Sequence, residues 1–227
     1  MSSDPIWARP EPPGRGGLSR AEIVRVALAV ADEEGLEAVS IRRLARELNS
    51  GAMSIYHYFA SRDELLELMA ETVAAGMLVP ELPEDWRAAL KAIAERSRAT
   101  FKAHPWMLTT LSERPRVTPN LLRHVEQTSQ ALRGLGEAGV DQALLTGLAF
   151  AVDDYLIGHT IRELAGSGRA ERFDDAAEEP HIRYLLESGE FPMLEQFVRS
   201  GGEVPHADRF EQGLDWLLDG FAARLGR

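Results

Sequence analysis

The sequence predicts an all-α protein with a small N-terminal three-helix domain and a larger C-terminal helical bundle. Apolar residues recur at the spacing of an amphipathic helix, as in Ile23, Val26 and Ala27. Two Ser-x-x-Glu capping boxes, Ser19–Glu22 and Ser61–Glu64, mark helix starts. No segment alternates polar and apolar residues in the way that a half-buried strand does.

Composition indicates a globular protein. The chain has 227 residues, of which 44% are hydrophobic and 27% charged, enough to form a packed core. It contains no Cys, which excludes disulfides and thiolate chemistry. We find neither a signal segment nor an apolar run of membrane-spanning length, so we expect a cytoplasmic protein with no membrane partner.

The net charge of −11 is unevenly distributed. Residues 1–65 carry 8 Arg and 10 acidic residues, whereas residues 66–227 carry 17 basic and 26 acidic residues. Within Ser40–Arg62, four Arg stand against one Glu. A local basic patch on an acidic body is compatible with phosphate binding by the N-terminal part of the chain.

Pro and Gly divide the chain into three parts. Residues 1–17 contain four Pro and three Gly without periodicity, and we expect a flexible arm. Residues 18–79 form the small domain, and residues 80–227 the larger one, with Pro80 and Pro83 at the boundary. The expected helices span about 19–35, 40–48, 52–58, 61–79, 86–104, 105–112, 119–136, 141–165, 181–187, 193–200 and 207–225. A polar loop is expected at 166–180.

Residues 40–59 carry the strongest motif, two short helices joined by the Gly-containing turn Asn49–Gly51. This is the helix-turn-helix arrangement, whose second helix enters the major groove of double-stranded DNA. Ile55 and Phe59 are four residues apart and face the core, which leaves polar and aromatic neighbours facing outward. The predicted DNA-contacting residues are Arg42, Ala52, Met53, Ser54, Tyr56, His57, Tyr58 and Arg62.

Simpler interpretations stand beside several of these assignments. The aromatic run Tyr56–Phe59 is also compatible with core packing, and Arg42 with a solvated helix face, as we expect for Arg43 and Arg46. His104 ends a predicted helix, where it either caps the helix dipole or contacts a ligand.

Residues 18–78 resemble the DNA-binding domain of the TetR family. The resemblance is carried by Val39-Ser-Ile-Arg-Arg-Leu-Ala45, by the turn at Asn49–Gly51, and by Ser54-Ile-Tyr-His-Tyr-Phe59 followed by Ser61-Arg62 and Leu65-Leu66. Residues 84–227 are similar to the family's effector domain through Asp85-Trp-Arg87, Arg114-Pro115, the long helix near 143–165 and the amphipathic last helix.

The resemblance implies a ligand-responsive bacterial repressor that binds operator DNA as a homodimer and is released by an unknown small-molecule effector. The effector pocket is then expected among Trp86, Phe101, Trp106, Met107, Thr110, Leu111, Leu122, Phe150 and Asp153. Where tetracycline-binding members carry a magnesium-binding His, four residues before Arg-Pro, this chain has Thr110. We therefore expect an effector other than tetracycline with magnesium, and no cofactor or metal.

Dimerisation also follows from the DNA interpretation, because two half-sites one turn apart give far more specificity than one. The last helix could finish the monomer core or join the long helix in a four-helix seam, and the family's dimers favour the seam. The expected interface consists of Leu148, Val152, Tyr155, Leu214, Leu217, Leu218, Phe221 and Leu225.

Two other functions stay open. One is an activator or architectural DNA-binding protein with no effector. The other is a small helical enzyme, for which Asp153 and His159 are the sole candidate residues, at a spacing that suits neither catalysis nor a metal. Asp153 and Asp154 interrupt an apolar helix, so each must be paired, exposed or functional. In the repressor interpretation, the effector tilts the helix at 62–79 and moves the recognition helices out of register.

Overall fold

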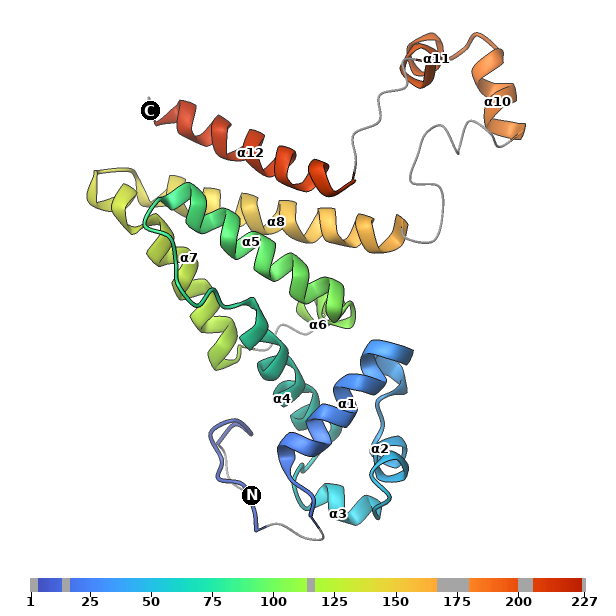
Figure 1. The fold of residues 1–227 in the computed structure, drawn as a ribbon, viewed down its shortest axis with the longest axis vertical. Coiled ribbons are helices and arrows are strands. Elements are labelled where there is room, and N and C mark those ends of the chain that lie inside the picture. The colour runs from blue at the N-terminus through green and yellow to red at the C-terminus, as the bar shows by residue number, and fades with distance from the viewer. Residues whose placement is uncertain (1–3, 14–16, 114–116, 167–179, 200–205, 226–227) are drawn as a thin grey trace. The chain divides into compact units, whose positions relative to one another are not determined.

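A computed structural model describes residues 4–13, 17–113, 117–166, 180–199 and 206–225 (Figure 1). Throughout these ranges the regular structure is helical and no strand occurs, so the predicted all-α class is confirmed. The chain forms two compact units, Met1–Ala149 and Phe150–Arg227, and each is described by itself. The loop predicted at 166–180 falls almost entirely outside the described residues.

Helix starts in the N-terminal part follow the predicted caps. The elements are α1 (Arg20–Glu34), η1 (Leu36–Ala38), α2 (Ile41–Glu47), α3 (Ala52–Tyr56), α4 (Arg62–Ala74) and η2 (Ala75–Met77). The hydroxyls of Ser19, Ser40 and Ser61 each accept a hydrogen bond from the backbone N–H three residues on. One detail of the capping prediction is wrong, because the Glu22 carboxylate pairs with Arg25 instead of a backbone amide.

Two N-terminal helices are shorter than predicted. Helix α3 ends at Tyr56, two residues before the predicted end. Helix α4 ends at Ala74 and continues as a 3₁₀ turn to Met77, where the prediction had one helix to residue 79. The first difference changes which side chains face outward.

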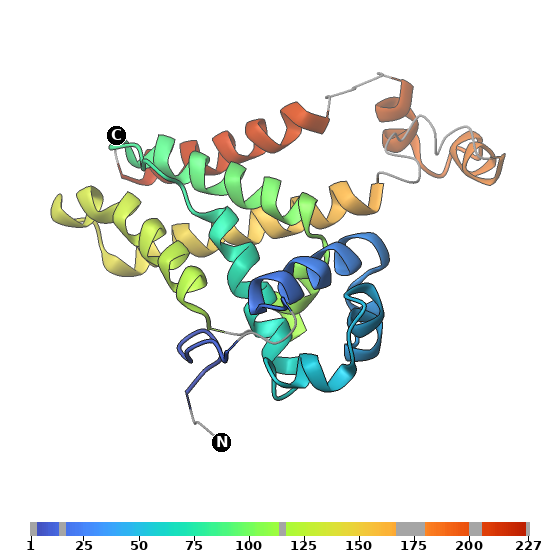
Figure 2. The ribbon, with the colours of Figure 1, turned by 60° about the horizontal axis from the view of Figure 1, so that its bottom comes forward.

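The small domain is built around one apolar core. Helix α1 packs against α2 and α4, and α2 packs against α3 (Figure 2). Ile23, Leu44, Ile55, Phe59 and Leu65 are fully buried where these helices meet. Burying each such side chain contributes about 1.5–3 kcal/mol, so this core fixes the arrangement of the helix-turn-helix.

The N-terminal arm makes tertiary contacts over residues 4–13, which the predicted flexible arm did not include. A turn closed by the Ala8 N–H and the Pro5 carbonyl places Ile6 in the interior, where 1% of its surface is exposed. The prediction failed because Pro and Gly content describes local stiffness, whereas this segment is held by tertiary contacts.

The later helices lie within a few residues of their predicted bounds. They are α5 (Trp86–Ala103), α6 (Trp106–Glu113), α7 (Pro119–Glu137), α8 (Gln142–Gly166), α10 (Pro180–Glu187), α11 (Pro192–Arg199) and α12 (His206–Arg224). Asp85 caps α5 by accepting from the Ala88 N–H, and Pro119 occupies the first turn of α7. None of the helices in the described ranges is long and apolar enough to span a membrane.

Helices α8 and α12 lie side by side in the second unit (Figure 1) and meet at Tyr155. Its hydroxyl lies 3.0 Å from both the Arg209 and the Phe210 carbonyl oxygens, to which it donates, and its ring stacks on Phe210. This close approach depends on Gly213, because a Cβ there would lie 2.8 Å from Tyr155 Cζ. A notch in α12 therefore receives a side chain from α8.

We expect Gly213→Ala to destabilise the protein by about 1–3 kcal/mol, because the added methyl overlaps the Tyr155 ring. Urea denaturation measures the change. Gly134→Ala, at a helical position with nothing within 4 Å of the added Cβ, serves as the control and should be neutral or stabilise by up to about 1 kcal/mol. Equal effects of the two substitutions would contradict the notch.

Candidate nucleic-acid interface

The helix-turn-helix is closed by a tight turn between α2 and α3. Asn49 takes a left-handed conformation with φ 46°, which its short polar side chain tolerates better than most. The Ser50 N–H donates to the Ala45 carbonyl at 2.8 Å and satisfies the end of α2. Gly51, in an extended conformation, then starts α3. The turn fixes α3 as a separate short helix.

Helix α3 presents the outward side chains that the sequence predicts. Met53 and Tyr56 are 79% and 48% exposed, although both are large and mainly apolar. Ala52 and Ser54 are half-buried, and Arg42 on α2 is exposed. A bare helix face with these groups is suited to contact base edges and thymine methyls.

Tyr58 is a correction to the predicted set. Its side chain is 3% exposed, and its hydroxyl donates to the Leu18 carbonyl at 2.7 Å. The prediction assumed a helix that continues to residue 58, but α3 ends at Tyr56 and the chain turns inward. Tyr58 therefore holds the end of α3 against the start of α1.

Arg62 is a second correction. Its Nε donates to the Val39 carbonyl and its Nη2 to the Leu36 carbonyl, both at 2.8 Å. These bonds hold the connection between α1 and α2 against the start of α4, so the guanidinium is committed within the protein. The sequence could not show this, because the acceptors are backbone atoms 23 and 26 residues away.

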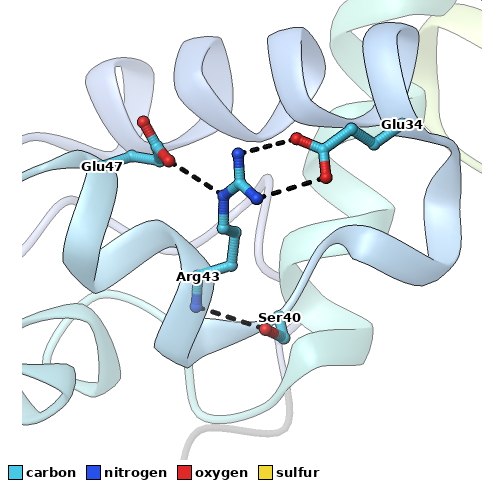
Figure 3. Close-up of polar contacts among 4 residues, drawn as sticks. All are labelled: Glu34, Ser40, Arg43 and Glu47. Atoms are coloured by element: carbon cyan, nitrogen blue, oxygen red, sulfur yellow. Dashed lines mark hydrogen bonds and ion pairs between the residues drawn. The ribbon is translucent and has the colours of Figure 1, made fainter.

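Arg43 holds α1 and α2 together and is not simply solvated (Figure 3). Its guanidinium donates to both carboxylate oxygens of Glu34, at 3.2 and 2.7 Å, and to Glu47 at 2.9 Å. Its backbone N–H donates to the capping Ser40. The adjacent Arg42 is exposed, so its charge faces solvent.

Comparison with known proteins identifies the family. Residues 23–69 match the family model described as bacterial regulatory proteins, tetR family, and residues 79–225 match the tetracyclin repressor-like C-terminal domain. The chain belongs to the TetR family. It is therefore a helix-turn-helix transcriptional regulator, and its relatives support a DNA-binding, ligand-responsive repressor.

Individual TetR-family relatives cover nearly the whole chain. The HTH-type transcriptional repressor DrrR1 of Streptomyces coeruleorubidus is 32% identical over 95% of this chain and 82% of its own length. Apo ActR from Streptomyces coelicolor has a TM-score of 0.74 at 30% identity and covers 94% of this chain and 99% of its own. ActR in complex with actinorhodin has a TM-score of 0.74 at 29% identity, over 92% and 97% of the two chains.

The residues predicted for the effector pocket lie in different environments. Phe101, Trp106 and Met107 are buried, and Trp86, Thr110 and Leu111 are half-buried. Leu122 and Phe150 are 56% and 65% exposed, so they are not enclosed, and their role in lining an effector site stays a prediction. They lie on helix faces that point to solvent, which helical spacing alone did not distinguish.

Asp153 remains a candidate polar group of this domain. Its side chain reaches solvent, yet the surrounding protein raises the pKa of its carboxyl, and the neighbouring charge of Asp154 raises it further. Thr110 donates its hydroxyl to the Trp106 carbonyl within α6. Across the described residues, no group of three or more potential metal ligands is placed to hold an ion.

The predicted dimer residues mostly pack inside their own chain. Leu148, Val152, Leu214, Leu218 and Phe221 are buried, and Tyr155, Leu217 and Leu225 are half-buried. The buried members of this set complete the core of the chain and do not form an outward seam, whereas the interface role of the half-buried members stays a prediction. The exposed apolar side chains of α8 and α12 are instead Phe150, Ile161 and Trp216.

A second group of residues, which we call the junction, ties the DNA-binding helices to α5, α6 and α7. At one end, Asp32 Oδ1 on α1 lies 2.8 Å from His104 Nδ1 and accepts a hydrogen bond from Trp106 Nε1, also at 2.8 Å. His104 is thus the C-cap of α5, as predicted, and also a partner of α1. One carboxylate oxygen joins the first helix of the chain to the start of α6.

The rest of the junction joins α4 and η2 to α7. Glu71 accepts from the Asn120 backbone N–H, and its own carbonyl accepts from the Asn120 side chain, at 2.9 and 3.0 Å. Gln127 makes two hydrogen bonds to the Val79 backbone, at 3.0 and 2.7 Å. Because Asn120, His124 and Gln127 share one helix face, His124 lies between the two ties. Burial lowers its pKa and keeps it neutral near pH 7.

None of the junction contacts was predicted from the sequence, although His104 was predicted as a helix cap and Trp106 as a pocket residue. Asp32 and His104 are 72 residues apart, and Glu71 and Asn120 are 49 apart. In the helical periodicity of the sequence, each of these residues occupies an ordinary surface or cap position. The Asp32 position, three residues before Gly35 at a helix end, carried no local signal of its partners.

We expect Asp32→Asn to lower the free energy of unfolding by about 1–2 kcal/mol. A neutral amide oxygen is a weaker hydrogen-bond acceptor for the rings of His104 and Trp106 than the charged carboxylate. Urea denaturation measures the loss. Glu137→Gln, which removes a carboxylate from the exposed pair with Arg133, is the matched control and should change stability by less than about 0.5 kcal/mol. An Asp32 variant as stable as this control would contradict the tie.

Proposed function

We propose that this TetR-family protein represses transcription in the bacterial cytoplasm by binding a two-fold operator as a homodimer, and that a small organic effector in residues 80–227 releases it. The observation that carries the proposal is the bare face of α3, where Met53 and Tyr56 are exposed on the second helix of the helix-turn-helix. The proposal includes no catalytic step, in keeping with relatives that are transcriptional regulators.

The proposed DNA surface is smaller than the sequence suggested. It consists of Arg42, Ala52, Met53, Ser54 and Tyr56. Arg42 supplies a charged donor for a phosphate or guanine, and Ser54 and Tyr56 supply hydroxyls. Ala52 and Met53 offer apolar contact for a thymine methyl. The buried Tyr58 and the committed Arg62 support this surface from behind.

The proposed dimer uses the outward faces of α8 and α12. Phe150 and Trp216 are 65% and 67% exposed, and Ile161 is also exposed. Gly158 on α8 and Gly220 on α12 have open space where a Cβ would stand, so a second helix could approach closely there. Large exposed apolar side chains beside small residues favour a helix–helix interface with a second copy of the chain.

Release by an effector is proposed to work through the junction. A ligand that favours a different position of α6 or α7 would strain the ties at Asp32, Glu71 and Val79, and so shift α1 and α4. The structures of ActR without ligand and with actinorhodin support an effector site in a protein of this kind. A ligand reverses a 99:1 population when it prefers the released state by about 10⁴-fold.

A gel-shift titration with DNA from upstream of the protein's own gene tests the proposal. We expect a specific protein–DNA complex that weakens as the salt concentration rises. Actinorhodin or a related compound that occupies the effector site should release the protein from the DNA. Binding that is indifferent to both sequence and salt would contradict operator recognition. A specific complex that no compound in a broad metabolite screen releases would contradict the effector part.

Arg42 and Arg43 provide a matched pair of substitutions. We expect Arg42→Ala to weaken operator binding by about 1–3 kcal/mol and leave stability unchanged, because its charge faces solvent. Arg43→Ala should instead lower the free energy of unfolding, because it removes the ion pairs with Glu34 and Glu47. Titration with operator DNA and thermal denaturation of both variants check this. The proposed surface fails if the two arginines exchange these effects.

Trp216 tests the dimer face. We expect Trp216→Glu to convert the dimer to monomer in sedimentation velocity, because a carboxylate would be buried in an apolar seam. Operator affinity should fall with it, since two half-sites would no longer be bound together. Val125→Glu, which places the same charge at an exposed apolar position of α7, is the control and should stay dimeric. A dimeric Trp216 variant would show that the seam lies elsewhere.

A further inference from the structure

The N-terminal arm, residues 4–13, is anchored on the DNA-binding helices. Its turn at Pro5–Ala8 places Ile6 in the interior, fully buried, while Trp7 beside it keeps 41% of its surface exposed. A buried Ile followed by an exposed Trp means that the backbone of the arm is held in one orientation. Burial of the Ile side chain contributes about 1.5–3 kcal/mol to that attachment.

Arg9 ties the arm to the start of α4. Its Nη2 lies 2.5 Å from Glu64 Oε1, and both side chains are largely shielded from solvent. The second oxygen of Glu64 accepts a hydrogen bond from the Ala60 N–H at 2.7 Å. Glu64 therefore joins the arm to the segment that directly follows the helix-turn-helix.

Arg20 ties the arm to the start of α1. Its Nη1 donates to the Arg9 carbonyl at 2.7 Å, and its backbone N–H donates to Glu11 Oε1 at 2.5 Å. Burial lowers the pKa of Arg20, and the nearby charge of Arg9 lowers it further. The nearby charges of Glu11 and Glu64 oppose this effect of Arg9, so the two arginines and two carboxylates form one network.

The arm also reaches the end of the recognition helix. His57, the residue after α3, places Nε2 3.3 Å from the Pro13 carbonyl, close enough for the ring N–H to donate. The Tyr58 hydroxyl donates to the Leu18 carbonyl, just before α1 begins. Both residues that follow α3 are therefore bonded to backbone near the arm, and His57 is bonded to the arm itself.

Helix α3 needs such support. It has five residues, and Gly51 provides no side-chain cap. A helix of this length has no stability of its own in water, so its direction is set by contacts at its two ends. The turn at Asn49–Gly51 fixes the first end, and the contacts of His57 and Tyr58 fix the second.

We propose that residues 4–13 form a brace that positions the recognition helix for operator binding, and that His57 holds this brace instead of contacting a base. The proposal rests on the operator binding proposed above. It changes the role of His57 from a DNA contact to a positioning residue. Arg9, Glu64 and Ile6 become determinants of DNA affinity although none of them lies on the face of α3.

The brace acts through geometry and not through charge. Arg9 and Arg20 direct their guanidinium groups to Glu64 and to a carbonyl of the arm. Removing Arg9 should therefore lower operator affinity without changing the number of counterions released. By contrast, loss of a phosphate contact lowers the salt slope of binding by about one.

Arg9→Met in the full-length chain tests the first step, because it keeps the stem of the side chain and removes the ion pair. We expect operator affinity to fall about three- to tenfold, with an unchanged salt slope and faster amide hydrogen exchange confined to residues 52–59. Arg133→Met, which removes an equal charge from the exposed end of α7, should change none of these. Unchanged affinity, a salt slope lowered by one, or faster exchange in every helix would each overturn the proposal.

A double-mutant cycle tests His57. We expect His57→Ala to weaken operator binding in the full-length protein and to have little further effect once residues 2–13 are deleted, because the two changes remove the same contact. Additive losses would overturn the proposal, since they would place His57 on the DNA. If the deletion does not fold, the cycle is run with Arg9→Met, and the same two outcomes decide.

Failure of the brace and failure of operator binding remain distinguishable. A wild-type protein that binds no DNA specifically would overturn the proposed function. Hydrogen exchange of free protein would still decide the brace, because it reports how residues 52–59 are held without any DNA. Wild-type operator binding together with unchanged Arg9 and His57 variants would overturn the brace alone.

Discussion

A five-residue recognition helix cannot hold its own direction, and the DNA-binding surface of this protein depends on how its ends are fixed. Ile55 and Phe59 anchor it from below in the apolar core. The left-handed Asn49 sets its entry, and Tyr58 sets its exit through the Leu18 carbonyl. The exposed residues of α3 owe their placement to these buried ones, so the orientation of the proposed DNA-binding surface is set largely from the core.

The arginines of the motif likewise divide into those bonded within the protein and one that is exposed. Arg43 and Arg62 both have internal partners, two carboxylates for Arg43 and two backbone carbonyls for Arg62. Arg42 remains exposed. A guanidinium group links two segments well because several donors lie at fixed positions in one plane. A count of basic residues in the motif therefore overstates the charge that is available to phosphate.

The sequence predicted what is decided locally. Caps at Ser19, Ser40 and Ser61 and the periodic apolar residues predicted nearly all helices to within a few residues, because both signals act within one or two turns. The predicted outward orientation of Tyr58 was wrong because tertiary contacts set the length of a helix next to a short turn. The junction and the brace were missed because their partners are far apart in the chain.

The proposed dimer face shows why the position of an apolar stripe on a helix is ambiguous. Leu214 and Leu218 follow helical spacing, yet they pack within the chain, while Trp216 between them points outward. A helix that serves both a core and an interface is apolar on two faces, and spacing alone does not say which face a neighbour of the same chain covers.

The strength of the junction bears on how an effector could act. Each of its hydrogen bonds contributes on the order of 1 kcal/mol, and reversing a 99:1 population takes about 5.5 kcal/mol. No single tie can therefore account for the switch. The ties at Asp32, Asn120 and Gln127 join α6 and α7 to α1, to α4 and to the Val79 backbone after η2, through six hydrogen bonds in all. A movement that strains all six reaches about the required size. Because these contacts lie at different points along α6 and α7, the proposed release needs a movement that strains several of them together, and a local shift at one contact is too small.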